Sequence, residues 1–227
     1  MKVLVRNLTL FLVLVFVFGC QRDKKPEMID VNLIEYRVEY IDDVAGSVPT
    51  SILPEKMTLI FHEDKALTSI EGFLGQFSLS YLADLKKQKV ITMLKLFDKN
   101  YYYEGEKGEL PAGIVPFRNM KIEETGDSAI ILDFMCRKYL IHSDQLDSKE
   151  IWSTTEIGVI NPNVTTPYRE IPGVLLQFYS QLSVLKMFLF IEKYQEKSIN
   201  KDLMDVPDNF KRISKSAMEK TLIELFK

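Results

Sequence analysis

One stretch of the chain alternates regularly between apolar and charged side chains: Asn32-Leu33-Ile34-Glu35-Tyr36-Arg37-Val38-Glu39-Tyr40-Ile41. Apolar side chains recur at every second position from Ile34 to Tyr40, and charged side chains lie between them. Because successive side chains of a β-strand point to opposite faces, this pattern predicts a strand with one buried and one solvated face. Half-buried strands of this kind are typical of antiparallel sheets.

Further runs along the chain have the patterns of short strands separated by polar turns. Residues 90–97 are apolar on nearly both faces, which predicts a central strand. Pro172-Gly173 interrupts a later run and should bend it. The remaining candidate strands are 57–61, 73–81, 101–103, 129–141, 150–158, 168–180 and 185–193. Many short strands predict a mainly β (α+β) fold, with a large curved antiparallel sheet or half-barrel.

Helical periodicity is clearest at the C-terminal end of the chain. Residues 214–227 place apolar side chains on one side and an even mixture of lysine and glutamate on the other, with Ser214 or Ser216 as the N-cap. A helix this short is marginal alone, so we expect it to pack on the sheet. A second short helix is predicted over residues 82–89.

The composition excludes several classes of function. The 227 residues have a net charge of −3 and no basic block, so no nucleic-acid partner is expected. Two cysteines are too few for a disulfide scaffold or a four-thiolate zinc site, and two histidines leave little for metal or acid–base chemistry. We expect neither a metal nor a cofactor.

The N-terminus has the pattern of a bacterial lipoprotein signal. Lys2 and Arg6 precede an apolar run, residues 8–18, that is too short to span a bilayer but has the length of a secretory signal. The following Val17-Phe18-Gly19-Cys20 resembles the lipobox, although Phe18 is larger than the usual residue there. This resemblance implies cleavage after Gly19 and acylation of Cys20. The alternative is an uncleaved N-terminal anchor with an incidental cysteine.

These signals predict three regions in the chain. Residues 1–19 form the signal peptide, residues 20–30 hold the lipidated Cys20 and a polar tether, and residues 31–227 form a single β-rich domain ending in the amphipathic helix. The acyl chains make the membrane the expected partner. The expected location is the cell envelope, at the outer membrane facing the periplasm, with exposure at the cell surface as the alternative.

The sequence lacks the familiar catalytic motifs. It has no glycine-rich phosphate loop, no His-Glu-x-x-His, no Cys-x-x-Cys and no Gly-x-Ser-x-Gly. His62 and His142 stand in polar segments typical of solvated turns, and Cys136 lies in an apolar run typical of a buried thiol. We therefore expect no enzymatic activity. A hydrolase with a site too dispersed for motif reading is the weakest alternative.

A series of motifs in the second half resembles a family of envelope proteins. The order is Cys136-Arg137-Lys138-Tyr139, then residues 150–157 with the only tryptophan, then Ile171-Pro172-Gly173 and an aliphatic run. This order resembles GLPGLI-type and related envelope proteins of Bacteroidetes, and residues 205–211 resemble the ending of that group. Phe210 stands where the family has tyrosine, and the Ile-Pro-Gly form replaces Leu-Pro-Gly.

The resemblance implies a curved antiparallel half-barrel with a helix against it, similar to the LolA/LolB-like lipoprotein carriers. Such a fold offers an apolar cleft, so the leading hypothesis is a lipid-anchored, non-enzymatic envelope protein that binds a lipid or another hydrophobic ligand. The candidate lining residues are the aromatic or bulky strand residues Tyr36, Tyr40, Phe77, Trp152, Leu176, Phe188 and Phe190. The alternative is a protein-interaction module of an outer-membrane assembly with a filled core and no cavity.

Overall fold

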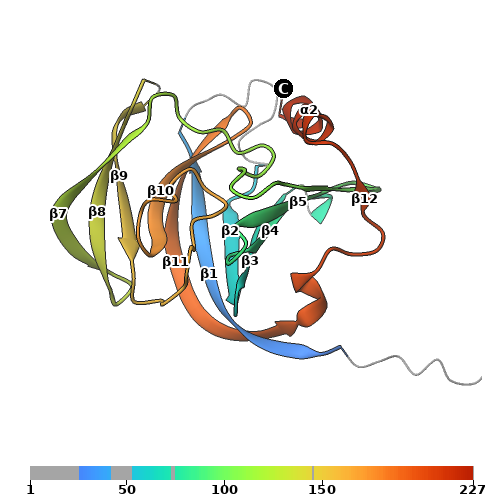
Figure 1. Ribbon diagram of the computed structural model, residues 1–227, viewed down its shortest axis with the longest axis horizontal. Coiled ribbons are helices and arrows are strands. Elements are labelled where there is room, and N and C mark those ends of the chain that lie inside the picture. The colour runs from blue at the N-terminus through green and yellow to red at the C-terminus, as the bar shows by residue number, and fades with distance from the viewer. Residues whose placement is uncertain (1–25, 42–52, 73–74, 145, 227) are drawn as a thin grey trace, which may run out of the picture.

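The computed structural model describes residues 26–41, 53–72, 75–144 and 146–226. The predicted signal peptide and Cys20 lie outside these residues. Within the described ranges, no helix is both long enough and apolar enough to cross a bilayer. The fold is mainly β, an open curved sheet with one α-helix near the C-terminus, which confirms the predicted fold class (Figure 1).

The described chain forms one twelve-stranded sheet. The strands are β1 (Met28–Tyr40), β2 (Lys56–His62), β3 (Lys65–Gly72), β4 (Phe77–Asp84), β5 (Lys89–Leu96), β6 (Lys99–Glu104), β7 (Lys121–Ile131), β8 (Phe134–Ser143), β9 (Leu146–Thr154), β10 (Val174–Leu182), β11 (Leu185–Asn200) and β12 (Lys211–Arg212). Their order in the sheet is β12-β6-β5-β4-β3-β2-β1-β11-β10-β9-β8-β7. The sheet therefore consists of two antiparallel meanders, β1 to β6 and β7 to β11, and β12 adds a short parallel pairing to β6.

The two meanders join where β1 pairs with β11. The antiparallel register runs from Met28 opposite Asn200 to Tyr40 opposite Met187. It shifts by one residue between Glu35 and Tyr36, where β11 forms a β-bulge. We call the face of the sheet that carries Ile34 and Tyr36 the inner face, and the face that carries Val31 and Leu33 the outer face. The two faces belong to two separate hydrophobic clusters.

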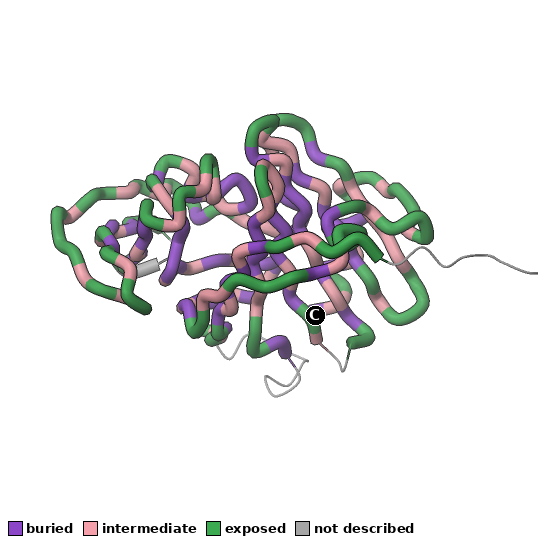
Figure 2. Tube along the Cα trace, turned by 90° about the horizontal axis from the view of Figure 1, so that it is seen from below, coloured by how far each residue is buried: buried purple, intermediate pink, exposed green. Residues whose placement is uncertain are grey.

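Three segments fill the inner face: residues 105–120, residues 155–173 and the C-terminal helix α2 (Lys215–Leu225). Figure 2 shows the buried positions concentrated along the middle of the molecule. The buried apolar side chains that these segments and the residue after α2 contribute are Ala112, Phe117, Val164, Tyr168, Ile171, Met218, Leu222 and Phe226. Their burial against the strands supplies most of the driving force for this packing.

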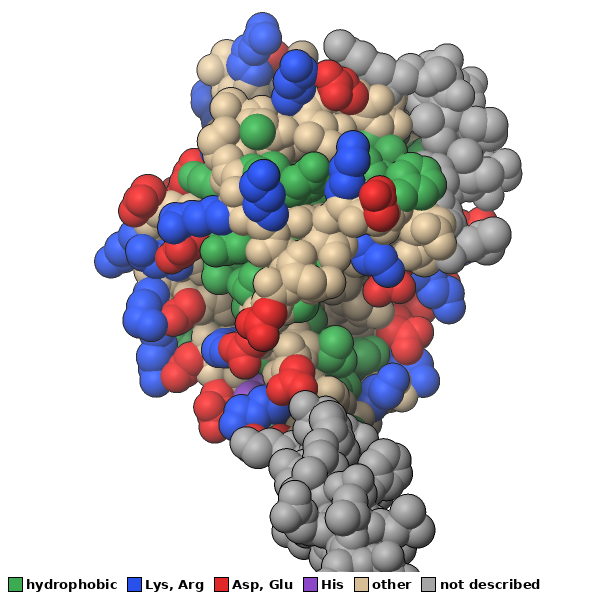
Figure 3. Space-filling model, turned by 90° about the vertical axis from the view of Figure 1, so that its right-hand side faces the viewer, with side chains coloured by type: hydrophobic (Ala, Val, Ile, Leu, Met, Phe, Trp, Pro, Cys, Tyr) green, Lys and Arg blue, Asp and Glu red, His purple; other side chains and the backbone are tan. Residues whose placement is uncertain are grey.

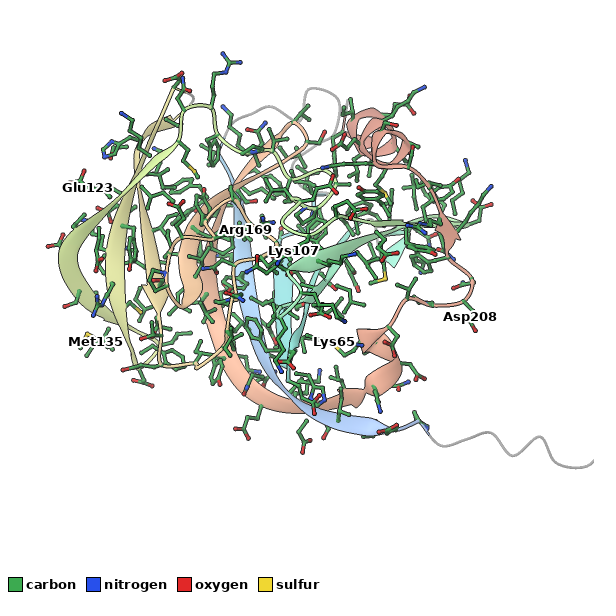
Figure 4. The ribbon with its side chains drawn as sticks, viewed as in Figure 1. Lys65, Lys107, Glu123, Met135, Arg169 and Asp208 are labelled. Atoms are coloured by element: carbon green, nitrogen blue, oxygen red, sulfur yellow. The ribbon has the colours of Figure 1, made fainter. Side chains whose placement is uncertain are left out.

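Polar contacts fix the segments to one another. The Arg169 guanidinium donates to the carbonyls of Glu109 and Val164, both at 2.9 Å, and to that of Gly108, which binds residues 155–173 to residues 105–120 (Figure 4). The Lys215 ammonium donates to the Glu109 carboxylate at 2.8 Å and holds the first turn of α2 on the same segment.

The C-terminal helix begins where the sequence predicts. The Ser214 side chain accepts a hydrogen bond from the Ala217 N–H, as an N-cap does. Met218 and Leu222, one helical turn apart, are fully buried on the side that faces the sheet.

A second core covers part of the outer face. It contains Val31 and Leu33 of β1 together with side chains from β2 to β5, and it is closed by Ile199 and Met204. Met204 belongs to the 3-10 helix η3 (Lys201–Met204), the start of a crossing segment, residues 201–213, that leads from β11 to α2 (Figure 1). Among the described residues, this core includes no side chain of β7, β8, β9 or β10.

Three local predictions are wrong. Residues 82–89 are not a helix. Strand β4 runs to Asp84, and a turn follows in which the Asp84 carboxylate accepts a hydrogen bond from the Lys87 N–H. Residues 129–141 are not one strand but the β7–β8 hairpin, because Leu132 and Asp133 adopt φ values of 46° and 68° and form its turn. The predicted bend lies at Gly173, whose φ is 78°. It precedes β10 rather than interrupting it.

Candidate functional site

The predicted lining residues separate into two groups. Tyr36, Phe77 and Leu176 are fully buried in the inner core, with at most 1% of each residue exposed. Tyr40 is half-buried beside the same core, and its hydroxyl donates to the Pro54 carbonyl at 2.7 Å. Trp152, Phe188 and Phe190 are half-buried. The seven residues therefore do not gather around one cavity.

The inner face retains a small cavity at Tyr36. Its volume is about 40 Å³, and Leu59, Tyr81 and Phe178 are among its apolar lining residues. Ligand pockets measure roughly 300–1,000 Å³ and a water molecule occupies about 30 Å³, so this cavity is too small for an acyl chain. Burial raises the pKa of Tyr36 far above its ordinary value, and its hydroxyl donates to the Leu175 carbonyl at 2.7 Å.

The other aromatic residues form a strip on the outer face of the second meander. Directly opposed residues on neighbouring strands share a face, and the register places Phe190 beside Gln177 and Gln177 beside Trp152. Tyr179 stands opposite Phe188, and their rings stack with centroids 4.5 Å apart. We call Trp152, Tyr179, Phe188 and Phe190 the aromatic strip.

Cations lie over three rings of the aromatic strip. The Arg37 guanidinium carbon is 3.9 Å from the centroid of the Phe190 ring. The Lys138 nitrogen is 6.0 Å from the centroid of Trp152, and the Lys149 nitrogen is 5.8 Å from that of Tyr179. Arg37 also pairs with Glu39 and Glu192 at 3.6 and 3.5 Å. The strip thus combines aromatic rings with both signs of charge on a half-exposed surface.

A larger hollow lies on the outer face of the first meander, between the crossing segment and the neighbouring ends of β3, β4, β5 and β6. We call it the outer groove; its volume is about 460 Å³. Its apolar lining residues are Leu82, Ala83, Ile91 and Val206. Its charged lining residues are Lys65, Asp84, Lys87, Lys89, Glu104 and Asp205. Figure 3 shows this side of the molecule, where acidic and basic side chains surround apolar patches.

The crossing segment is held over the groove by a lysine. The Lys65 ammonium donates to the Asp205 carboxylate at 2.8 Å and to the Met204 carbonyl at 2.9 Å. Figure 4 shows Lys65 beside this segment, with Asp208 further along it. Because Met204 is also buried in the outer core, the groove has one wall fixed by both an ion pair and apolar packing.

A third hollow, of about 320 Å³, lies where β8 and β9 meet residues 155–172. Its lining mixes polar and apolar residues, and its carboxylates already have partners. Glu124 pairs with Arg137 at 3.1 Å, and Glu156 accepts a hydrogen bond from the Met135 N–H at 3.0 Å. Nowhere in the described ranges do three His, Cys, Asp or Glu side chains stand close enough to hold a metal ion.

The outer groove was missed by the sequence analysis. Lys87 and Lys89 fell in the incorrectly predicted helix, and Asp205-Val206 entered only as part of a family motif. The one available signal was the isolated lysine cluster at residues 86–89, directly before a strong apolar strand pattern.

Comparisons with known proteins support the fold alone. A scan against protein-family models found no match, and neither did a search of curated proteins. Among solved structures, the chain is similar to PNGF-II in two crystal forms, with a TM-score of 0.56 and identities of 14% and 13%. The similarity covers 87% of this chain but 34% and 33% of the two PNGF-II chains, so this chain spans about a third of their length.

Proposed function

We propose that this protein is a non-enzymatic, lipid-anchored protein of the cell envelope that binds a small hydrophobic or amphipathic ligand in the outer groove. The observation that carries the proposal is the volume of about 460 Å³, whose apolar lining includes Leu82, Ile91 and Val206. That volume lies within the usual range for ligand pockets, which combine apolar surface with polar groups that fix the orientation of the ligand.

The proposed binding site, the outer groove, differs from the apolar cleft that the family resemblance implies. Among the described residues, the inner-face cavity at Tyr36 measures about 40 Å³, whereas the outer groove beside the crossing segment measures about 460 Å³. The resemblance to GLPGLI-type envelope proteins remains part of the proposal, since the motif residues 205–211 belong to this segment and Asp205 lines the groove.

The ligand part of the proposal is tested by photolabelling. The full-length chain in phosphatidylcholine nanodiscs is irradiated with decanol that carries a diazirine, and labelled peptides are identified by mass spectrometry. We expect label in peptides that cover residues 82–91 and 201–211, and we expect Ile91→Asp to lose it. Ile130→Asp, a change at an exposed position on the β7 edge strand, is the matched control. Label absent from the groove peptides, or unchanged in Ile91→Asp, would overturn this part.

The anchor rests on Cys20. Two or three acyl chains at about 0.8 kcal/mol per buried methylene hold a protein to a bilayer almost permanently. Metabolic labelling with palmitate should mark the protein, and Cys20→Ala should abolish the label. Cys136→Ala replaces the buried cysteine and should keep it. Label that persists on Cys20→Ala would exclude acylation at this position.

The aromatic strip favours a second candidate function, a module that docks a partner protein. Aromatic side chains and arginine are enriched at protein interfaces, and the strip combines four aromatic rings with Arg37. A photocrosslinker placed at Tyr179 should then give one defined crosslinked species in envelopes, and Phe190→Ala should abolish it. The same crosslinker at Lys95, an exposed residue of β5, serves as the control. Equal crosslinking from both positions would argue against docking at the strip.

A further inference from the structure

We infer that the ligand of the outer groove is an amphipathic monoanion, an inference that rests on the proposed function of this groove. The charged head of the ligand, a carboxylate or a group of similar charge, is bound by the Lys89 ammonium. The apolar body of the ligand then lies along Leu82 and Ile91 toward Val206. The inference depends on how the six charged lining residues divide into pairs.

Every carboxylate of the groove already has a cationic partner. Asp205 pairs with Lys65 at 2.8 Å, and Glu104 pairs with Arg212 at 3.4 Å. Asp84 is opposite Lys89 in the β4–β5 register, but both of its oxygens are used by Lys87. The Lys87 N–H donates to Oδ1 at 2.8 Å, and the Lys87 ammonium lies 2.9 Å from Oδ2.

Of the three lysines that line the groove, Lys65 and Lys87 take part in these ion pairs and Lys89 does not. Within the described part of the chain its ammonium has neither an ion pair nor a hydrogen bond, although the residue is half-buried and lines the groove. A cation beside an apolar surface is less screened than one in free water, so it attracts an anion more strongly there. A charge-assisted hydrogen bond to a carboxylate is the strongest contact that this ammonium can make.

The position of Lys89 matches an amphipathic ligand. Lys89 and Ile91 are two residues apart on β5 and point to the same face, about 7 Å from one another. Ile91 stands opposite Leu82, so an apolar surface begins directly beside the ammonium. A head group on Lys89 therefore lets the next carbon atoms of the ligand contact both side chains.

The same charges limit the ligand to a single negative charge. Asp84, Glu104 and Asp205 also line the groove, so a second negative charge on the ligand would be repelled by at least one carboxylate. A cationic head would leave Lys89 without a partner and would compete with Lys65 and Lys87 for carboxylates that are already paired.

Three diazirine probes of equal chain length test the inference on the full-length chain in phosphatidylcholine nanodiscs: decanoate, decanol and decyltrimethylammonium. We expect decanoate to label the groove peptides at a concentration at least tenfold below that needed for decanol, and decyltrimethylammonium to label them least. Lys89→Gln should remove the tenfold preference for decanoate, and Lys89→Arg should keep it. Lys107→Gln changes an exposed lysine away from the groove that forms no ion pair with any described residue, and it should leave the preference unchanged (Figure 4).

The outcomes separate this inference from the proposed function. If all three probes label the groove peptides equally, or if Lys89→Gln keeps the preference for decanoate, the groove binds apolar chains and the anion inference is overturned. If none of the probes labels the groove peptides, the proposed ligand function fails and the inference fails with it.

Discussion

The two meanders of the sheet use the same alternating pattern but differ in how their faces are covered. The first meander is covered on both faces, by α2 and the 105–120 segment inside and by the crossing segment outside. The second meander is covered on its inner face, while its outer face carries the half-exposed aromatic strip. The difference arises at the C-terminal end, because the chain after β11 returns over the first meander only (Figure 1).

The strand sequences reflect this difference. In β5, buried side chains belong to both cores, with Leu94 in the inner and Met93 in the outer one. In β7 none of the residues is fully buried, and Ile130 is 70% exposed at the free edge. A strand covered on two faces needs apolar residues at consecutive positions, whereas an edge strand covered on one face does not.

The largest effect should come from the inner core of the first meander. Phe77 is fully buried and its ring packs edge-on against that of Phe226, with centroids 5.9 Å apart. Phe77→Ala should lower the free energy of unfolding by about 3–5 kcal/mol. Phe188→Ala in the aromatic strip should cost about 1 kcal/mol. Urea denaturation of both variants measures the contrast, and equal losses would contradict it.

The second largest effect should come from loosening the outer cover. Met204 is 2% exposed, so Met204→Ala leaves a cavity between the crossing segment and the sheet, at a cost of about 2–3 kcal/mol. Hydrogen exchange should accelerate in β3 and β4 and stay unchanged in β8 and β9. Leu203→Ala, at the 54% exposed neighbour, is the control. Acceleration in both meanders would mean that they unfold as one unit.

An intermediate effect is expected at the contact between α2 and the 105–120 segment. The hydrogen bond from the Lys215 ammonium is the main cause that lowers the pKa of Glu109 from 4.5 to about 2. The ionised carboxylate therefore stabilises the folded chain fully above about pH 4.5, and this contribution is lost as the pH falls toward 2. Glu109→Gln should cost about 1–2 kcal/mol at pH 7 and progressively less below pH 4.5.

Melting temperatures measured from pH 7 to pH 2.5 test this dependence. Glu106→Gln, at an exposed residue three positions away, should keep the wild-type profile. A stability difference between Glu109→Gln and wild type that stays constant over the whole pH range would rule out the ion pair as its source.

The smallest effect belongs to the outer face of the second meander. Arg37→Ala removes the cation over the Phe190 ring and should cost about 0.5–1 kcal/mol, since both partners are partly solvated. Lys193→Ala, on the strand paired with β1, should change stability less than Arg37→Ala does. A loss of several kcal/mol for Arg37→Ala would show that this face is as tightly packed as the outer face of the first meander.

Alternation in the sequence predicts the strands well but does not tell the inner face from the outer one. In β11 the residues Met187, Leu189 and Ile191 are buried, and the equally apolar Phe188 and Phe190 between them point outward. Both sets satisfy a period of two, so only the pairing with β1 and β10 decides between them. The prediction of Phe188 and Phe190 as lining residues had no means of making that distinction.

The outer groove could not be predicted because its residues are distant in sequence. Lys65, Lys89 and Asp205 meet only after β3, β4 and β5 have paired and the crossing segment has returned. By contrast, Ser214 and the helix after it were predictable, because an N-cap and a four-residue periodicity are local signals.

The pairing of β1 with β11 has a consequence for how the chain acquires its structure. The Lys201 ammonium bonds to Glu27, which lies 174 residues earlier, so the first strand finds its neighbour only when nearly the whole polypeptide is available. Contacts at such separation make folding slow, because a large loop must close before they contribute. One side of β1 therefore stays unpaired through most of the synthesis of the chain, and an unpaired strand edge of this kind is prone to aggregation.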